Sequence, residues 1–364
     1  MVYVKLTTQD CIHNGYKYKE GLNCLNGEFN NKKVCYSGGL YFCLEKDIGK
    51  WIYYNDKQMH YIWDVKLLND SKIVDMDDKL KTDKFILSNK RSIWDNEELC
   101  KLAVQKDCFA LQYVKKQTDE ICKLAIQNNY NSFHYVKPEL MSEEICKLTV
   151  EKCWYQIEYV PPELMNEKIC KLAVQQSSYA LRYIKPEFQM EEICKLAVQK
   201  DGYALQYVKK QTYEICKLAI QENSSVLRYV NPELMNEKIC KLAVQKSSYA
   251  LQYIKPEFQM EEICKLAVRQ NGYTLKYVDK QTDEICKLAV SSYGYALCYV
   301  KPEFRSYEIC KLAVIQDGGS LQYVPPEFLS YEICKLAVQQ FSYALKWVKK
   351  EYKTQLLKFI STFD

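Results

Sequence analysis

The apolar and polar residues between positions 96 and 350 follow one pattern that returns along the chain. In the segment DEICKLAI, successive residues turn by about 100° if they form an α-helix. Ile121, Cys122, Leu124, Ala125 and Ile126 then cover most of the circumference, and Lys123 lies in a narrow polar strip. This distribution predicts a helix that packs between two neighbouring layers.

A second short segment, FALQYV in the first repeat, follows each such helix. Drawn as a helix, it places Ala110, Leu111 and Val114 on the expected core face. Phe109 and Tyr113 lie away from the centre of that face. A proline or a Lys-Gln-Thr link comes next and predicts the end of the helix, because proline disfavours helical backbone.

One cysteine position marks each repeat, and its successive members are 22 or 24 residues apart. A period of about 20 to 50 residues is typical of solenoids, whose short helices are stabilised by stacking. We therefore predict a mainly α fold: a right-handed α-solenoid of eleven short helix pairs, stacked as in ankyrin and HEAT arrays. Its expected bounds are 91–350, with 351–364 as a C-terminal capping helix. The marker cysteines are Cys100, Cys122, Cys146, Cys170, Cys194, Cys216, Cys240, Cys264, Cys286, Cys310 and Cys334.

Helix starts are predicted by the residue four positions before each marker cysteine. In nine of the eleven repeats this residue is Ser, Thr or Asn, whose side-chain oxygen can accept a hydrogen bond from a free backbone N–H group. Met190 and Met260 are the exceptions. The nine expected caps are Asn96, Thr118, Ser142, Asn166, Thr212, Asn236, Thr282, Ser306 and Ser330.

Residues 1–90 lack the repeat and predict a separate, small β-rich domain. Four segments, MVYVKLTT, GGLYFCL, MHYIWDVKLL and DKFILSN, are rich in β-branched and aromatic residues and are separated by Gly and Asn. A linker, SNKRSIWDN, joins this domain to the first repeat. We expect Trp94 in that linker to cover the end of the helix stack.

The cysteines are expected to be free thiols in a reducing compartment, because no export signal or membrane-spanning apolar run is visible. Equivalent cysteines in neighbouring layers would be about 10 Å apart, too far for a disulfide. The spacing of Cys11, Cys24, Cys35 and Cys43 contains no paired metal-ligand motif, so a zinc site there remains an alternative only. We predict no metal site and no cofactor.

A lysine follows every marker cysteine, from Lys101 to Lys335, and such a row could track a phosphate backbone. An acidic residue precedes each lysine by three or four positions, as Asp119 precedes Lys123. Pairs of this kind favour a salt-paired, solvent-facing strip. The net charge of +5 is also too small to indicate nucleic-acid binding by itself, which therefore remains a weaker alternative.

Tyrosine is unusually frequent, with 31 residues, and it forms two columns in the second segments. We expect the first column to pack between layers. The second column is our candidate partner-binding surface, because exposed aromatic side chains are enriched at binding hot spots. The first column is Tyr113, Tyr135, Tyr159, Tyr183, Tyr207, Tyr229, Tyr253, Tyr277, Tyr299, Tyr323 and Trp347. The candidates from the second column are Tyr155, Tyr179, Tyr203, Tyr249, Tyr273, Tyr295 and Tyr343.

Units of the type ICKLAVQKDGYALQYVKPEF resemble a short tandem repeat of unknown function that is abundant in giant viruses of the mimivirus type and also found in bacteria. The segments GYKYKEGLN, GGLYFC, IWDVKLL and DDKLKTDKFIL resemble a module that these viruses place before ankyrin and other repeats. The resemblance implies a viral protein in the host cytoplasm, with the virus factory or the virion as alternative locations. It also implies binding to host or viral proteins.

We therefore expect a non-enzymatic scaffold for protein–protein interactions, without a catalytic residue and without a membrane. The rival hypothesis is a nucleotide-using N-terminal domain, similar to ADP-ribosyltransferases in active or degenerate form, fused to a targeting solenoid. It predicts a ligand pocket within residues 1–90. No phosphate-binding loop, nucleophile elbow or metal-binding His motif occurs in the sequence.

Overall fold

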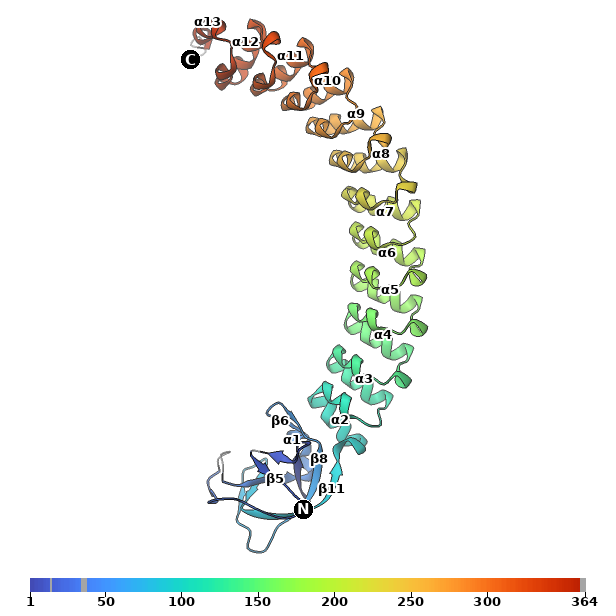
Figure 1. Ribbon diagram of the computed structural model, residues 1–364, viewed down its shortest axis with the longest axis vertical. Helices are drawn as coiled ribbons and strands as arrows, with labels where there is room; N and C mark the ends of the chain where they lie inside the picture. The colour runs from blue at the N-terminus through green and yellow to red at the C-terminus, as the bar shows by residue number, and fades with distance from the viewer. Residues whose placement is uncertain (14, 34–37, 361–364) are drawn as a thin grey trace. The chain divides into compact units, whose positions relative to one another are not determined.

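The computed structural model describes residues 1–13, 15–33 and 38–360, and Figure 1 shows their secondary structure. The chain divides into two compact units, Met1–Ala173 and Val174–Asp364. The first unit contains a β-sheet region followed by tandem repeated helices, and the second contains further repeats of the same kind. The predicted combination of repeated helices with an N-terminal β region is confirmed.

The β region is built on a sheet that has seven strands within the described residues, in the order β4-β11-β8-β1-β5-β10-β9. Neighbouring strands in this order pair in antiparallel fashion. The four segments predicted as strands form β1, β5, β8 and β11. The strands are β1 Tyr3–Thr7, β4 Gly21–Cys24, β5 Leu40–Leu44, β8 Tyr61–Lys66, β9 Ile73–Asp75, β10 Leu80–Thr82 and β11 Lys84–Ser92.

Short elements complete the β region beside this sheet. Two small hairpins and one helical turn lie between the longer strands, and the turn of the second hairpin has positive φ at Asn55 and Asp56. The core of the region contains Phe42, Phe85 and Leu87. The short elements are β2 Ile12–His13 with β3 Tyr16–Lys17, β6 Tyr53–Tyr54 with β7 Lys57–Gln58, η1 Glu45–Asp47, α1 Ile48–Trp51 and η2 Ile93–Asp95.

Trp94 joins the β region to the first repeat, as its place in the linker predicted. Its side chain is 6% exposed, and its indole Nε1 donates a hydrogen bond to His60 Nδ1 at 3.0 Å. The ring of Tyr113 lies 5.4 Å from Trp94 and 4.7 Å from His60. These three rings therefore cover the end of the first repeat.

Each repeat begins with an α-helix of ten residues. Ile121, Cys122, Ala125 and Ile126 are fully buried in α3, as the apolar pattern predicted. Neighbouring helices pack on both sides, as α10 packs against α9 and α11. The helices are α2 Glu97–Lys106, α3 Asp119–Asn128, α4 Glu143–Lys152, α5 Glu167–Gln176, α6 Glu191–Lys200, α7 Tyr213–Glu222, α8 Glu237–Lys246, α9 Glu261–Gln270, α10 Asp283–Ser292, α11 Tyr307–Gln316 and α12 Tyr331–Gln340.

The second segment of each repeat is a 3₁₀-helix, whereas the sequence pattern was drawn with α-helical geometry. A segment of six residues ends before an α-helical ladder becomes established, and the backbone closes with tighter i to i+3 bonds such as Val114 N–H to Leu111 O at 3.2 Å. The expected core residues Ala110, Leu111 and Val114 are nevertheless buried. These helices are η3 Cys108–Tyr113, η4 Tyr130–Tyr135, η6 Trp154–Tyr159, η8 Ser178–Arg182, η10 Gly202–Tyr207, η11 Ser224–Tyr229, η13 Ser248–Tyr253, η15 Gly272–Tyr277, η16 Gly294–Tyr299, η18 Gly318–Tyr323 and η20 Ser342–Trp347.

The longer connectors contain one more helical turn, within a segment that the sequence pattern predicted as a link. Proline at its first position suits a helix start, because its missing N–H group would have no partner there. These turns are η5 Pro138–Leu140, η7 Pro162–Leu164, η9 Pro186–Phe188, η12 Pro232–Leu234, η14 Pro256–Phe258, η17 Pro302–Phe304 and η19 Pro326–Phe328.

All nine predicted caps are confirmed, because each accepts a hydrogen bond from the backbone N–H group three residues later. The bond from Leu99 N to Asn96 Oδ1 measures 2.9 Å, and that from Ile239 N to Asn236 Oδ1 measures 3.1 Å. Met190 and Met260 precede α6 and α9 without a side-chain cap. The other capping bonds end on Thr118, Ser142, Asn166, Thr212, Thr282, Ser306 and Ser330.

The described chain ends with α13, Lys350–Ile360, where a closing helix was predicted. Leu356 is fully buried, and α13 packs against α12. Of the helices within the described residues, none has the length and apolar character required to cross a membrane.

Candidate functional site

Several second-column tyrosines contact a first-column ring of the following repeat, as Tyr179 contacts Tyr207 and Tyr295 contacts Tyr323. We define the tyrosine face as Tyr155, Tyr179, Tyr203, Tyr249, Tyr273, Tyr295 and Tyr343 with the first-column rings that they contact. The ring of Tyr273 meets that of Tyr299 at 5.3 Å and 87°, and Tyr203 meets Tyr229 at 6.4 Å and 70°. Edge-to-face contacts of this kind hold aromatic rings in place while leaving part of each ring accessible.

Exposure differs along the tyrosine face. Tyr203, Tyr249 and Tyr343 are 37%, 43% and 57% exposed, and the other four candidates are half-buried. The first column was expected to pack between layers, but this is wrong for three members that are at least 38% exposed. A tyrosine can pack the base of its ring against a neighbour and still keep the hydroxyl end in water. The three exposed first-column residues are Tyr113, Tyr135 and Tyr159.

Cationic side chains lie on several of these rings. Lys276 Nζ is 4.3 Å from the ring centre of Tyr273 and donates a hydrogen bond to its hydroxyl at 2.8 Å. The Lys276 ammonium therefore lowers the pKa of the Tyr273 hydroxyl, and Arg182 lowers that of Tyr179 in the same way. Aromatic rings with Arg or Lys on their faces are typical of binding surfaces.

The second column is interrupted where a neighbouring tyrosine needs the space. A Cβ atom at Gly319 would lie 2.3 Å from the hydroxyl of Tyr295. At another interruption, the hydroxyl groups of Tyr203 and Ser225 are 3.0 Å apart. The small residues at these two positions therefore leave room for the tyrosine of the preceding repeat.

A glutamine five residues before the marker cysteine connects successive repeats, and it was not among the residues predicted to have a role. Gln211 Nε2 donates to the backbone oxygen of Tyr229 at 2.7 Å, and Gln211 Oε1 accepts from the N–H group of Asn231 at 2.8 Å. The connection fixes the backbone next to a first-column tyrosine of the following repeat. The recurring Gln was the available signal, and equivalent pairs of bonds are made by Gln117, Gln189, Gln259 and Gln281.

The lysine strip is paired with acidic residues in many repeats, as predicted. Lys265 Nζ lies 3.1 Å from Glu261 of its own helix and 2.7 Å from Glu284 of the next. In two repeats a lysine, Lys168 or Lys238, occupies the position of the acidic partner from the next helix. The other pairs between repeats are Lys101–Glu120, Lys123–Glu144, Lys287–Glu308 and Lys311–Glu332.

The marker cysteines are free thiols buried between helices. Burial raises the pKa of Cys122 and Cys216 to about 11, which keeps these thiols protonated and unreactive. Cys11 and Cys43 are also buried in the β region, whereas Cys24 is exposed and Cys35 lies outside the described residues. Within the described residues, no group of three or more His, Cys, Asp or Glu side chains is arranged to hold a metal ion.

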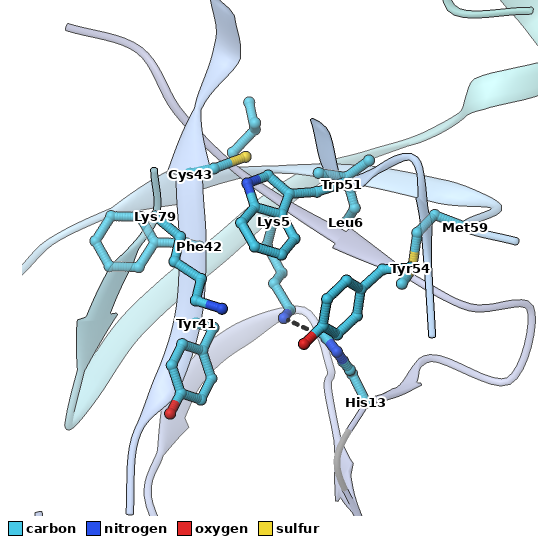
Figure 2. A pocket seen from close by; sticks show the side chains of 11 residues that line it. Lys5, Leu6, His13, Tyr41, Phe42, Cys43, Trp51, Tyr54, Met59 and Lys79 are labelled. Carbon is cyan, nitrogen blue, oxygen red and sulfur yellow. Dashed lines mark hydrogen bonds between the residues drawn. The ribbon is translucent and has the colours of Figure 1, made fainter. Parts of the chain in front are cut away.

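A pocket does lie within residues 1–90, where the hypothesis of a nucleotide-using domain required one. Its walls include Lys5, His13, Trp51, Tyr54 and Lys79, and the cavity measures about 60 Å³. Figure 2 shows these side chains around the opening. None of the described residues that line it is Asp or Glu, so the pocket contains no candidate for a catalytic glutamate.

A family model for a domain of unknown function, DUF4116, matches six segments that together cover more than half of the chain. The chain belongs to the DUF4116 family. The first DUF4116 match contains α2, η3, α3 and η4, so one family unit corresponds to two of the repeats described above. The matched residues are 96–141, 142–189, 191–235, 212–259, 260–305 and 306–353.

Two mimivirus proteins share shorter segments with this DUF4116 chain. "Uncharacterized protein R869" of Acanthamoeba polyphaga mimivirus is 46% identical over 55 residues, or 15% of this chain and 40% of that protein. "Putative ankyrin repeat protein R868" of the same virus is 46% identical over 43 residues, or 11% of this chain and 21% of that protein. The chain thus spans less than half the length of these relatives. The resemblance to giant-virus repeat proteins is confirmed.

Proposed function

We propose that the repeats form a non-enzymatic scaffold that binds another protein through the tyrosine face. The observation that carries the proposal is the exposure of Tyr203, Tyr249 and Tyr343 at equivalent positions of different repeats. Tyrosine supplies a large contact area at a low cost in conformational entropy. Repetition also lets several weak contacts act together on one partner.

The pairing of the lysine strip with carboxylates favours protein binding over nucleic-acid binding. Lys265 has three carboxylates within 3.4 Å, so a phosphate would have to compete with them. The name of the ankyrin repeat relative is consistent with a scaffold, because ankyrin arrays use stacked repeats as binding surfaces.

The finer architecture belongs to the same proposal. We propose a right-handed solenoid of eleven helix pairs over 91–350, preceded by a β domain over 1–90 and closed by a capping helix over 351–364. The mimivirus relatives favour a viral protein that acts on host or viral proteins in the host cytoplasm, the virus factory or the virion.

The test compares two sets of exposed tyrosines in the full chain. Tyr203→Ala, Tyr249→Ala and Tyr343→Ala are combined in one variant. Tyr213→Ala and Tyr307→Ala form the matched control, because these tyrosines are 36% and 38% exposed, stand at helix starts and belong to neither tyrosine column. Each tagged protein is cross-linked in amoeba lysate, and the captured proteins are quantified by mass spectrometry.

We expect the three tyrosine-face substitutions to reduce the captured amount of at least one protein by at least about tenfold, since a few aromatic residues carry most of the energy of an interface. The control substitutions should leave that amount unchanged. Circular dichroism checks that both variants keep the helical signal of the parent chain. Equal capture by all three proteins would reject the tyrosine face as the binding surface.

A further inference from the structure

The pocket of the β region surrounds a buried lysine. Lys5 lies on the central strand β1 and is only 2% exposed, although lysine side chains are seldom fully buried without a charged partner. Its Nζ lies 3.0 Å from His13 Nδ1 and 4.4 Å from the ring centre of Tyr18. Figure 2 shows the Lys5 side chain reaching across the pocket to His13, beside Tyr54.

A second lysine lies over the aromatic wall of the same pocket. Lys79 Nζ is 4.4 Å from the ring centre of Trp51, 5.4 Å from that of Tyr41 and 5.7 Å from that of Tyr54. These contacts hold the Lys79 ammonium at the pocket through the negative faces of the rings. Two amino groups and one imidazole thus converge on one cavity.

The pocket lacks a negative partner for these groups. Among the described residues, no carboxylate lines the cavity and no ion pair is formed by Lys5 or Lys79. The titratable neighbours of Lys5 are His13 on β2, Cys43 on β5, Tyr18 after β3, and Lys79, which precedes β10. A buried ammonium without a counter-ion is costly, because it loses its hydration without electrostatic compensation.

The pKa values of Lys5 and His13 reflect the burial of basic groups without a carboxylate partner among the described residues. Burial lowers the pKa of Lys5 to about 7; Cys43 opposes this lowering in part, and Lys79 adds a smaller lowering of its own. Burial lowers the pKa of His13 to about 3, and the nearby Lys5, Lys57 and Lys79 add to the effect. His13 is therefore neutral near pH 7, and its Nδ1 accepts a hydrogen bond from Lys5 when Lys5 is an ammonium.

We propose that this pocket binds the carboxylate of a small organic acid, with Lys5 and Lys79 holding its oxygens and Trp51 and Tyr54 packing its apolar part. A volume of about 60 Å³ accommodates a group of a few heavy atoms, because one water needs about 10 to 15 Å³ of such space. Leu6, Phe42 and Met59 make the remaining wall apolar. This wall favours a monoanion, since a phosphate dianion would lose more hydration energy on entry.

Binding of the carboxylate is coupled to proton uptake. The acid enters as its anion, and Lys5 takes one proton from solution and becomes an ammonium that pairs with it. Above the pKa of free Lys5, affinity then falls with rising pH, by roughly tenfold per unit in the limit. Below that pKa, Lys5 is already protonated and affinity becomes independent of the state of this group.

The test is isothermal titration calorimetry of the full chain with propionate at pH 6.5 and pH 8.5, in two buffers with different ionisation enthalpies. We expect propionate to bind at least about tenfold more tightly at pH 6.5 and to take up protons at pH 8.5. Lys5→Met, which preserves length and apolar packing, should abolish binding at both values. Lys50→Met is the matched control, because Lys50 is an exposed lysine whose Nζ is paired with Asp47 at 2.8 Å.

A second pocket variant tests the proposal independently of Lys5→Met. Lys79→Met replaces a half-buried side chain and should weaken propionate binding at least about tenfold, even if Lys5→Met fails to fold. Absence of propionate binding to the parent chain would overturn the proposal. Equal binding by folded Lys5→Met would do the same, and binding of inorganic phosphate without propionate would overturn the assignment to a carboxylate.

Discussion

At the scale of single residues, identical sequence positions acquire different surroundings. The marker cysteines behave alike because each is buried between helices. The second-column tyrosines range from half-buried to 57% exposed, because each depends on the residue that the next repeat presents. Equivalent positions of the repeats therefore differ in exposure on the tyrosine face, whereas the buried positions between the helices are alike.

Lys5 gives a prediction about stability. The unfolded chain binds a proton at this amine up to about pH 10.5, whereas the folded chain releases it above about pH 7. The unfolded state thus holds more protons between these values, and the penalty from Lys5 grows as pH falls through this window and is complete below about pH 7. Lys5→Met removes the penalty and should raise the free energy of unfolding of the β region at pH 7 by on the order of 4 kcal/mol.

Urea unfolding at pH 7 and pH 9.5 measures this effect. The advantage of Lys5→Met over the parent chain should shrink markedly at the higher pH, while Lys50→Met should show no such change. An advantage that is equal at both values would indicate improved packing and contradict the role of the charge.

At the scale of elements, the connection between helices matters as much as the helices themselves. The 3₁₀-helix places a first-column tyrosine next to the backbone atoms that the glutamine of the preceding repeat binds. Gln211 therefore links η11 to the connector that precedes α7 through two side-chain bonds. Hydrogen bonds to backbone groups between layers resist sliding of one repeat over the next.

Gln211→Ala tests this link. The substitution leaves the oxygen of Tyr229 and the N–H group of Asn231 without their partner and should lower the free energy of unfolding by about 1 to 3 kcal/mol. Gln206→Ala is the matched control, because exposed Gln206 donates to the oxygen of Tyr203 within its own 3₁₀-helix at 3.0 Å. Urea denaturation followed by circular dichroism compares the two, and equal losses would contradict a special role for Gln211.

At the scale of the whole molecule, each repeat depends mainly on its neighbours. The segment that starts at Leu164 nearly returns at Leu234, so a block of three repeats occurs twice. Contacts within the second unit join adjacent helices, as α9 contacts α8 and α10. Stability in such arrays is approximately a sum of repeat and interface contributions.

Deletion of one three-repeat block tests whether the interfaces between repeats are interchangeable. Removal of residues 194–263 joins Ile193 to Cys264 and restores the EEICKLAV phrase. The shortened chain should fold with an unchanged mean residue ellipticity, because the new neighbours meet through equivalent surfaces. Removal of residues 194–253 is the control, since it interrupts the repeat and should lose helical signal and cooperativity. A similar loss in both chains would contradict interchangeable interfaces.

Local patterns made much of the repeat region predictable. Thr118 and Ser142 predicted helix starts because capping depends on a side chain and a backbone group three residues apart. The burial of Cys122 and Ile126 followed from a helical period. The candidate site was predictable only as a set of positions, because exposure of Tyr203 or Tyr249 depends on neighbouring layers. Partner binding at these tyrosines stays a prediction.

The sequence by itself determined the repeat, its helix starts and its buried column, since these depend on residues within one turn or one period of each other. Only the tertiary structure decided the 3₁₀ geometry of the second segment, the glutamine links and the neighbours of each tyrosine. It also brought Lys5, His13 and Lys79 from distant parts of the chain to one cavity. Antiparallel pairing of β1 with β5 and of β5 with β10 brings Lys5 close to Lys79, and no local sequence period encodes which strands become neighbours.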